Sequence, residues 1–107
     1  MLRESLLSLC QTGPDEVFRM QNGANEIAKI YAKAFNKLLT DSGLNYKNIR
    51  AIGAHGQTIR HNPQIGASTQ LINGALLAEL TKTDVITDFR SRDLAADIFR
   101  AFALCQQ

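Results

Sequence analysis

The clearest pattern of hydrophobic and polar positions lies between residues 25 and 40. Apolar side chains recur there at spacings of three and four: Ile27, Ile30, Tyr31, Ala34, Phe35, Leu38 and Leu39. This spacing places them on one face of a helix, and Gly43 is suited to the left-handed cap that ends one. Lys29, Lys33 and Lys37 repeat on the other side, which is typical of a face in water. We therefore expect an amphipathic helix from Asn25 to Thr40 that packs on a sheet.

Shorter runs predict the remaining elements. A first helix is expected from Leu2 to Cys10, followed by Gly13-Pro14 and by Asp15 as a cap for the next helix. β-Branched, apolar stretches at Ile49–Gly53 and Val85–Asp88 predict two strands.

The region between these two strands contains turn signals and a second helical pattern. Thr58–His61 and Thr69–Ile72 are expected to pair as a hairpin around Pro63 and Gly66. Asn73 is placed to cap a helix through Ala75, Leu76, Leu77, Ala78 and Leu80. Strand, helix and strand form a βαβ unit, whose strands are parallel in nearly all cases. His55 and Asp88, which follow the two strands, are therefore expected side by side at one sheet edge.

Composition narrows the class of protein. The 107 residues, 45% hydrophobic and 21% charged, are those of an ordinary globular domain. A net charge of +2 without a Lys/Arg run argues against a nucleic-acid binder. Cys10 and Cys105 lie at opposite ends of the chain, so neither a disulfide framework nor a zinc site is indicated. Without a long apolar run or a signal peptide, we expect a cytoplasmic protein that does not enter a membrane.

Polar chemistry is concentrated between Gly53 and His61, which contains both histidines of the chain. This stretch, Ala51-Ile52-Gly53-Ala54-His55-Gly56-Gln57-Thr58-Ile59-Arg60-His61, is followed by Gln70, Ala75-Leu76-Leu77-Ala78-Glu79 and Asp88-Phe89-Arg90-Ser91-Arg92-Asp93. Together these motifs resemble anhydro-N-acetylmuramic acid kinases, over roughly residues 2 to 96.

The resemblance implies an α/β fold, part of an actin-like sugar-kinase lobe of the ribonuclease H-like type, with a short, mostly parallel sheet covered by helices. It also implies a cytoplasmic enzyme of amino sugar metabolism and peptidoglycan turnover. Such an enzyme uses ATP and Mg²⁺ to phosphorylate the 6-oxygen of 1,6-anhydro-N-acetylmuramic acid while water opens the anhydro bond. By resemblance, His55, Gln57, Thr58, Asp88 and Arg90 are the expected sugar-binding residues. No catalytic, nucleotide-binding or metal-binding residue is assigned.

The sequence also departs from the family pattern. Family members carry a phosphate-binding strand-turn-strand segment ahead of the region matched here, and a catalytic aspartate in a later Asp-Thr-Gly-Pro-Gly segment. Neither motif occurs in these 107 residues. Residues 97–107 depart from the family's Gly-Gly-Gln-Gly run, and Ile72-Asn73 replaces its Gly-Asp. The expectation is a single partial domain, residues 1–107, resembling the second half of the first lobe and inactive in isolation.

Other interpretations of the same residues stay open. The polar side chains of residues 53–61 also suit a loop that bonds its own backbone, and alternating charges at residues 88–93 suit local ion pairs. A metal hydrolase would need a third ligand beside His55 and His61, with Asp88 the best candidate. The alternative function is a noncatalytic folded remnant that forms a homodimer through exposed apolar faces.

Overall fold

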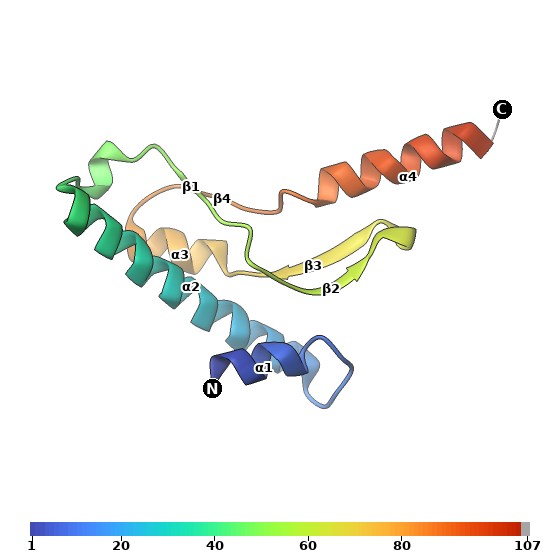
Figure 1. The fold of residues 1–107 in the computed structure, drawn as a ribbon, viewed down its shortest axis with the longest axis horizontal. Helices are drawn as coiled ribbons and strands as arrows, with labels where there is room; N and C mark the ends of the chain where they lie inside the picture. The colour runs from blue at the N-terminus through green and yellow to red at the C-terminus, as the bar shows by residue number, and fades with distance from the viewer. Residues whose placement is uncertain (106–107) are drawn as a thin grey trace.

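The structure is a computed structural model that describes the backbone of residues 1–105 and the side chains of residues 1–98. Figure 1 shows a mixed α/β chain whose elements are, in order, α1 (Leu2–Ser8), α2 (Glu16–Ser42), β1 (Ile52–Gly53), β2 (Gln57–Asn62), β3 (Ala67–Leu71), α3 (Gly74–Thr81), β4 (Val85–Ile86) and α4 (Ser91–Cys105). Two 3₁₀ turns, Tyr46–Asn48 and Pro63–Ile65, precede β1 and β3. Among the described helices, none is both long enough and apolar enough to cross a membrane.

The two strands predicted to be parallel are parallel. Ile52 pairs with Val85 and Gly53 with Ile86, and α3 lies in the connection between them. The ladder is shorter than predicted, however. Residues 49 to 51 lie outside β1, and Asp88 cannot extend β4 because its φ of 61° is left-handed rather than extended. The result is a short parallel pair whose carboxyl ends are held at one edge.

The predicted hairpin and the predicted cap of α3 are both present. β2 and β3 are antiparallel, with Thr58 opposite Gln70 and His61 opposite Ser68. The Asn73 side chain accepts a hydrogen bond from the Leu76 N–H at 3.0 Å, which satisfies one of the free donors at the start of α3. These features follow from short-range sequence signals and place the hairpin directly before α3.

Helix α2 is longer than its apolar pattern predicted, since it begins at Glu16 instead of Asn25. The carboxylate of Glu16 lies in the first turn, where its negative charge interacts favourably with the positive end of the helix dipole. The Asp15 side chain makes no cap hydrogen bond. At the other end, Gly43 adopts φ 72° and the Leu44 N–H bonds the Leu39 carbonyl, as expected for a glycine cap.

The buried face of α2 differs from the predicted one. Ile27 is buried, but Ile30 and Leu38 are 50% and 65% exposed. Instead, Ala28 and Ala32 pack with Leu77 of α3 in one core cluster, so α2 packs closely on that helix as well as on the strands. Alanines allow two helices to approach closely, and this rotates the buried stripe away from Ile30 and Leu38.

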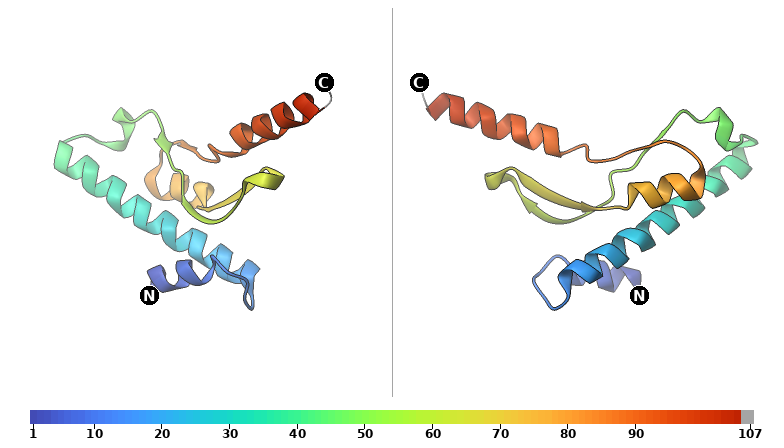
Figure 2. Two further views of the ribbon diagram at one scale, coloured as in Figure 1. Left: turned by 45° about the vertical axis from the view of Figure 1, so that its right-hand side comes forward. Right: turned by 180° about the vertical axis from the view of Figure 1, so that it is seen from behind.

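A second core cluster joins α1 and α2 to the hairpin. Its buried members are Leu9, Ile27, Ile59 and Leu71. Gly23 of α2 lies under β3, and a Cβ there would come within 3.3 Å of the Leu71 side chain. In both views of Figure 2, α4 extends away from α1 and α2, on the same side of the chain as the hairpin. The two clusters therefore hold the hairpin and the parallel pair on one side of α2.

Candidate functional site

The carboxyl ends of β1 and β4 open onto a hollow of about 320 Å³. His55 follows β1 and Asp88 follows β4, and both line this hollow, as the parallel pairing predicts. The other lining residues come from β3, from the segments that follow β3 and β4, and from the start of α4: Ser68, Thr69, Gln70, Ile72, Thr87 and Ser91. We call this the carboxyl-edge hollow. Its lining is mainly polar, which suits a ligand rich in hydroxyl groups.

Asp88 is held in an uncommon backbone conformation. Its φ of 61° is left-handed, and its exposed carboxylate accepts a hydrogen bond from the Ser91 hydroxyl. A left-handed conformation costs a non-glycine residue about 1 to 2 kcal/mol, although aspartate tolerates it better than most. Such outliers cluster at functional sites, where the surrounding structure maintains them. The carboxylate of Asp88 is therefore accessible and is oriented by Ser91.

His55 is oriented by an aromatic neighbour. Its ring stacks on that of Phe89, with the centroids 6.2 Å apart and the planes within 7°. Gly53 leaves room for this arrangement, because a Cβ there would lie 3.3 Å from the Phe89 ring. The loops after β1 and β4 are thus joined by side-chain packing as well as by the strand ladder.

Gly56 brings β3 against the loop after β1. It has φ 78°, and an added Cβ would lie 2.5 Å from the Leu71 carbonyl oxygen. Only glycine combines this backbone conformation with so close an approach. The polar face of the hairpin can therefore form a wall of the carboxyl-edge hollow.

That wall is a chain of hydrogen bonds. The Gln70 amide donates to Thr58 Oγ1 at 3.1 Å and to Ser68 Oγ at 2.5 Å, and His61 Nδ1 lies 3.1 Å from Ser68 Oγ. Gln70 and Ser68 were not among the predicted site residues. Gln70 lies in the predicted second strand of the hairpin, but Ser68 lies outside its predicted range. The observed register sets these two residues opposite Thr58 and His61, and residues opposite each other on paired strands share a face.

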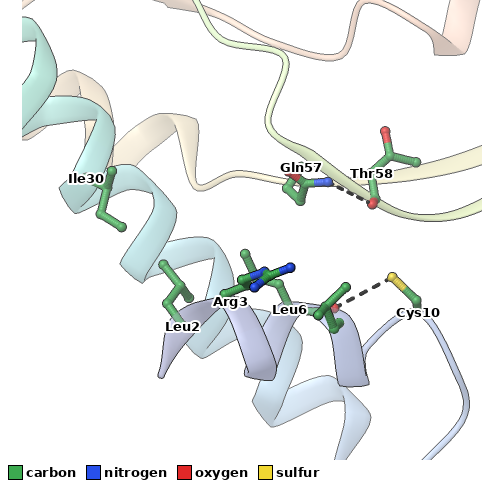
Figure 3. Close-up of a pocket in the computed structure, with 8 residues that line it drawn as sticks. Leu2, Arg3, Leu6, Cys10, Ile30, Gln57 and Thr58 are labelled. Carbon is green, nitrogen blue, oxygen red and sulfur yellow. Dashed lines mark hydrogen bonds between the residues drawn. The ribbon is translucent and has the colours of Figure 1, made fainter.

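The structure separates Gln57 from the carboxyl-edge hollow. Gln57 is absent from the lining of that hollow, and neighbouring residues on a strand point their side chains to opposite faces, so its side chain is directed away from the Gln70 amide that bonds Thr58. Figure 3 shows Gln57 and Thr58 bordering a different hollow of about 440 Å³ against α1 and α2, whose other lining residues are Leu2, Arg3, Leu6, Leu7, Cys10 and Ile30. Of the predicted residues, His55 and Asp88 line the same hollow, and Thr58 is connected to this hollow through Gln70. Arg90 is half-buried and lines neither hollow.

The two histidines do not converge. His61 lies against Ser68 on the hairpin, whereas His55 stacks on Phe89. Among the residues that the structure describes, no three His, Cys, Asp or Glu side chains are grouped so that they can hold a metal ion. The geometry therefore gives no support to the interpretation as a metal hydrolase.

The βαβ unit, with polar side chains at the carboxyl edge of its strands, is typical of α/β proteins that bind small ligands. Comparison with known proteins defines the class further: the family model described as anhydro-N-acetylmuramic acid kinase matches residues 1–98. The chain belongs to the anhydro-N-acetylmuramic acid kinase family.

Individual relatives agree with this family. An anhydro-N-acetylmuramic acid kinase of Burkholderia pseudomallei is 53% identical over 95 residues, which cover 89% of this chain and 24% of the relative. The proteins of the same name from Burkholderia thailandensis and Burkholderia ambifaria are 52% and 53% identical over 95 residues, or 25% of their length. The chain thus spans about a quarter of the length of the curated relatives it matches.

Proposed function

We propose that this chain forms the sugar-binding part of the first lobe of a kinase that phosphorylates 1,6-anhydro-N-acetylmuramic acid at its 6-oxygen. The single observation that carries the proposal is the meeting of His55, Asp88 and Gln70 around one polar hollow at the carboxyl edge of a parallel strand pair. Membership of the family supports it. The actin-like architecture, the role in cell-wall recycling and the cytoplasmic location are parts of the same proposal.

The chemistry of the hollow suits an amino sugar. Asp88 offers a carboxylate acceptor for sugar hydroxyls, and a carboxylate makes stronger hydrogen bonds than a neutral oxygen does. The Gln70 amide oxygen and the hydroxyls of Ser68 and Thr87 add further acceptors and donors. The volume of about 320 Å³ is within the range of small-molecule sites. In the proposal Thr58 acts by orienting Gln70, and Gln57 and Arg90 make contacts that need the rest of the kinase.

ATP and Mg²⁺ are the proposed co-substrate and cofactor, and together they supply the phosphoryl group and neutralise the charge that develops during its transfer. Phosphoryl transfer depends almost entirely on positioning and charge stabilisation around the nucleotide phosphates. None of the described residues is assigned to those phosphates. We therefore propose that residues 1–107 taken alone bind sugar weakly and do not turn it over.

A second candidate function rests on exposed apolar residues at the corner of α1 and α2. Val17, Phe18 and Leu7 are 71%, 69% and 59% exposed. Exposed apolar side chains can take part in an interface, so the alternative is a noncatalytic module that forms homodimers. Light scattering of the purified chain across a range of concentrations tests it: a strict monomer would remove this alternative.

The kinase proposal is tested in a chimera in which residues 1–98 replace the matching segment of the Burkholderia thailandensis relative. The chimera should phosphorylate the anhydro sugar in a coupled ATP-consumption assay. Asp88→Asn should lower kcat/KM for the sugar about tenfold to a hundredfold, the effect of losing a charged hydrogen bond. The matched control is Glu79→Gln, which removes an exposed carboxylate from α3. Equal rates for the parent chimera and Asp88→Asn would overturn the site assignment.

A further inference from the structure

A second polar hollow, of about 520 Å³, lies at the opposite end of the parallel strand pair. It is lined by two segments, residues 46–50 before β1 and residues 82–84 before β4. The Ile52 N–H bonds the Asp84 carbonyl at 2.8 Å, so the two segments run side by side where the strands begin. We call this the amino-edge hollow. The length of the strands separates it from His55 and Asp88.

The amino-edge hollow has an excess of positive charge. Lys47, Arg50 and Lys82 line it, and Asp84 is the only acid among its lining residues. Three cations and one carboxylate leave a local charge of +2 (3 − 1). All three cations are exposed, and within residues 1–98 no carboxylate lies within 4.0 Å of any of them. The chain pairs other cations, for example Lys37 with Asp41 at 2.7 Å. The positive charge of the hollow is therefore not neutralised by the described part of the chain.

The backbone at Lys82 is an independent sign of function. Lys82 follows α3 with φ 54° and ψ 34°, the left-handed conformation in which helices usually place glycine or asparagine. A lysine there is strained, and strained residues in native proteins cluster at functional sites. What lysine adds over glycine at this position is an ammonium group, on a residue that lines the hollow.

We propose that the amino-edge hollow binds a phosphomonoester dianion. Arg50 supplies a planar, forked set of N–H donors that matches a phosphate, and Lys47 and Lys82 supply ammonium charges from both segments. The local charge of +2 balances a dianion. The volume of about 520 Å³ is larger than a phosphate group needs, so the organic part of a small phosphorylated molecule also fits. This proposal does not depend on the kinase assignment.

The test is a titration of inorganic phosphate into the ¹⁵N-labelled chain, with chloride added to keep the ionic strength constant. Saturable shifts of backbone amides, confined to residues 46–50 and 82–84, are expected. Glucose 6-phosphate and adenosine monophosphate, titrated in the same way, distinguish a sugar phosphate from a nucleotide as the better ligand. Arg50→Gln and Lys82→Gly should each weaken phosphate binding about tenfold, as expected for the loss of one charged hydrogen bond.

Two controls keep the result decisive. Lys33→Gln removes the same charge from the exposed face of α2 and should leave phosphate binding unchanged. Lys82→Gly relieves a left-handed backbone, so its Tm should stay or rise while its phosphate affinity falls. Shifts that do not saturate, or an equal loss of affinity in Lys33→Gln, would overturn the proposal. If the NMR spectrum of the isolated chain shows no dispersion, the same ligands are titrated into the chimera instead. Binding to the chimera is then measured by calorimetry.

Discussion

Arg60 in β2 donates its Nη2 hydrogen to the carboxylate of Glu16, the first residue of α2, across 2.5 Å. The Nε of the same guanidinium donates to the Leu9 carbonyl at 3.0 Å, just after α1. One side chain thus holds the hairpin to both N-terminal helices. Because the hairpin also carries Ser68 and Gln70, this contact helps to place a wall of the carboxyl-edge hollow.

Removing this contact should destabilise the chain more than removing a surface ion pair. The side chains of Arg60 and Glu16 are only 32% and 34% exposed. Arg60→Met should therefore lower the free energy of unfolding by about 1 to 2 kcal/mol, measured by urea denaturation. Lys37→Met, which breaks the exposed Lys37–Asp41 pair, should cost less than about 0.5 kcal/mol. A coupling energy near zero in the double-mutant cycle with Glu16→Gln would contradict this role for Arg60.

Gly56→Ala should be the most damaging glycine substitution in the site. The new Cβ adds the left-handed cost to a close contact of 2.5 Å with the Leu71 carbonyl, so a loss of about 3 kcal/mol or more is expected. Gly43 also has a positive φ, of 72°, but no atom lies within 4 Å of its added Cβ. Gly43→Ala should therefore cost only about 1 kcal/mol. Similar losses for the two variants, by thermal or urea melts, would argue against the close approach of β3.

Gln70 should matter for the sugar more than Gln57 does. Gln70→Ala removes the amide that bonds Thr58 and Ser68 at the wall of the hollow, and in the chimera the KM for the sugar should rise about tenfold. Gln57 lies on the other face of β2, where, within the described residues, its amide donates only to the neighbouring Thr58 carbonyl at 3.3 Å. A larger effect of Gln57→Ala than of Gln70→Ala would move the proposed sugar site to the hollow beside α1.

The buried face of α2 can be mapped by paired substitutions in the isolated chain. Leu77 is fully buried against Ala28 and Ala32, and Leu77→Ala should cost about 2 to 5 kcal/mol of unfolding free energy. Leu38 belongs to the apolar stripe seen in the sequence but is 65% exposed. Leu38→Ala should therefore change stability by about 0.5 kcal/mol or less. Comparable losses at both positions would show that α2 also buries the face that carries Leu38.

Short-range patterns in the sequence were sufficient for the elements and for part of the site. The helix stop at Gly43, the cap at Asn73 and the presence of the β2–β3 hairpin all follow from residue types close together in the sequence. The parallel strand pair follows from the order of strand, helix and strand. Local hydrogen bonding and chain connectivity determine these features, and both can be read from the sequence. The sequence could therefore predict that His55 and Asp88 share one edge of the sheet.

The tertiary structure decided which faces are buried and which polar residues meet. Helix α2 buries Ala28 and Ala32 because α3, a partner distant in sequence, approaches where side chains are small. In β2 an irregular register between Thr58 and Arg60 leaves Ile59 without a partner and puts Thr58 and His61 on one face. Gln57 faces away from Thr58 because neighbouring side chains on a strand point to opposite faces. The strain at Asp88 and Lys82 likewise comes from how the chain enters and leaves its packed elements, which depends on contacts between residues far apart in the sequence.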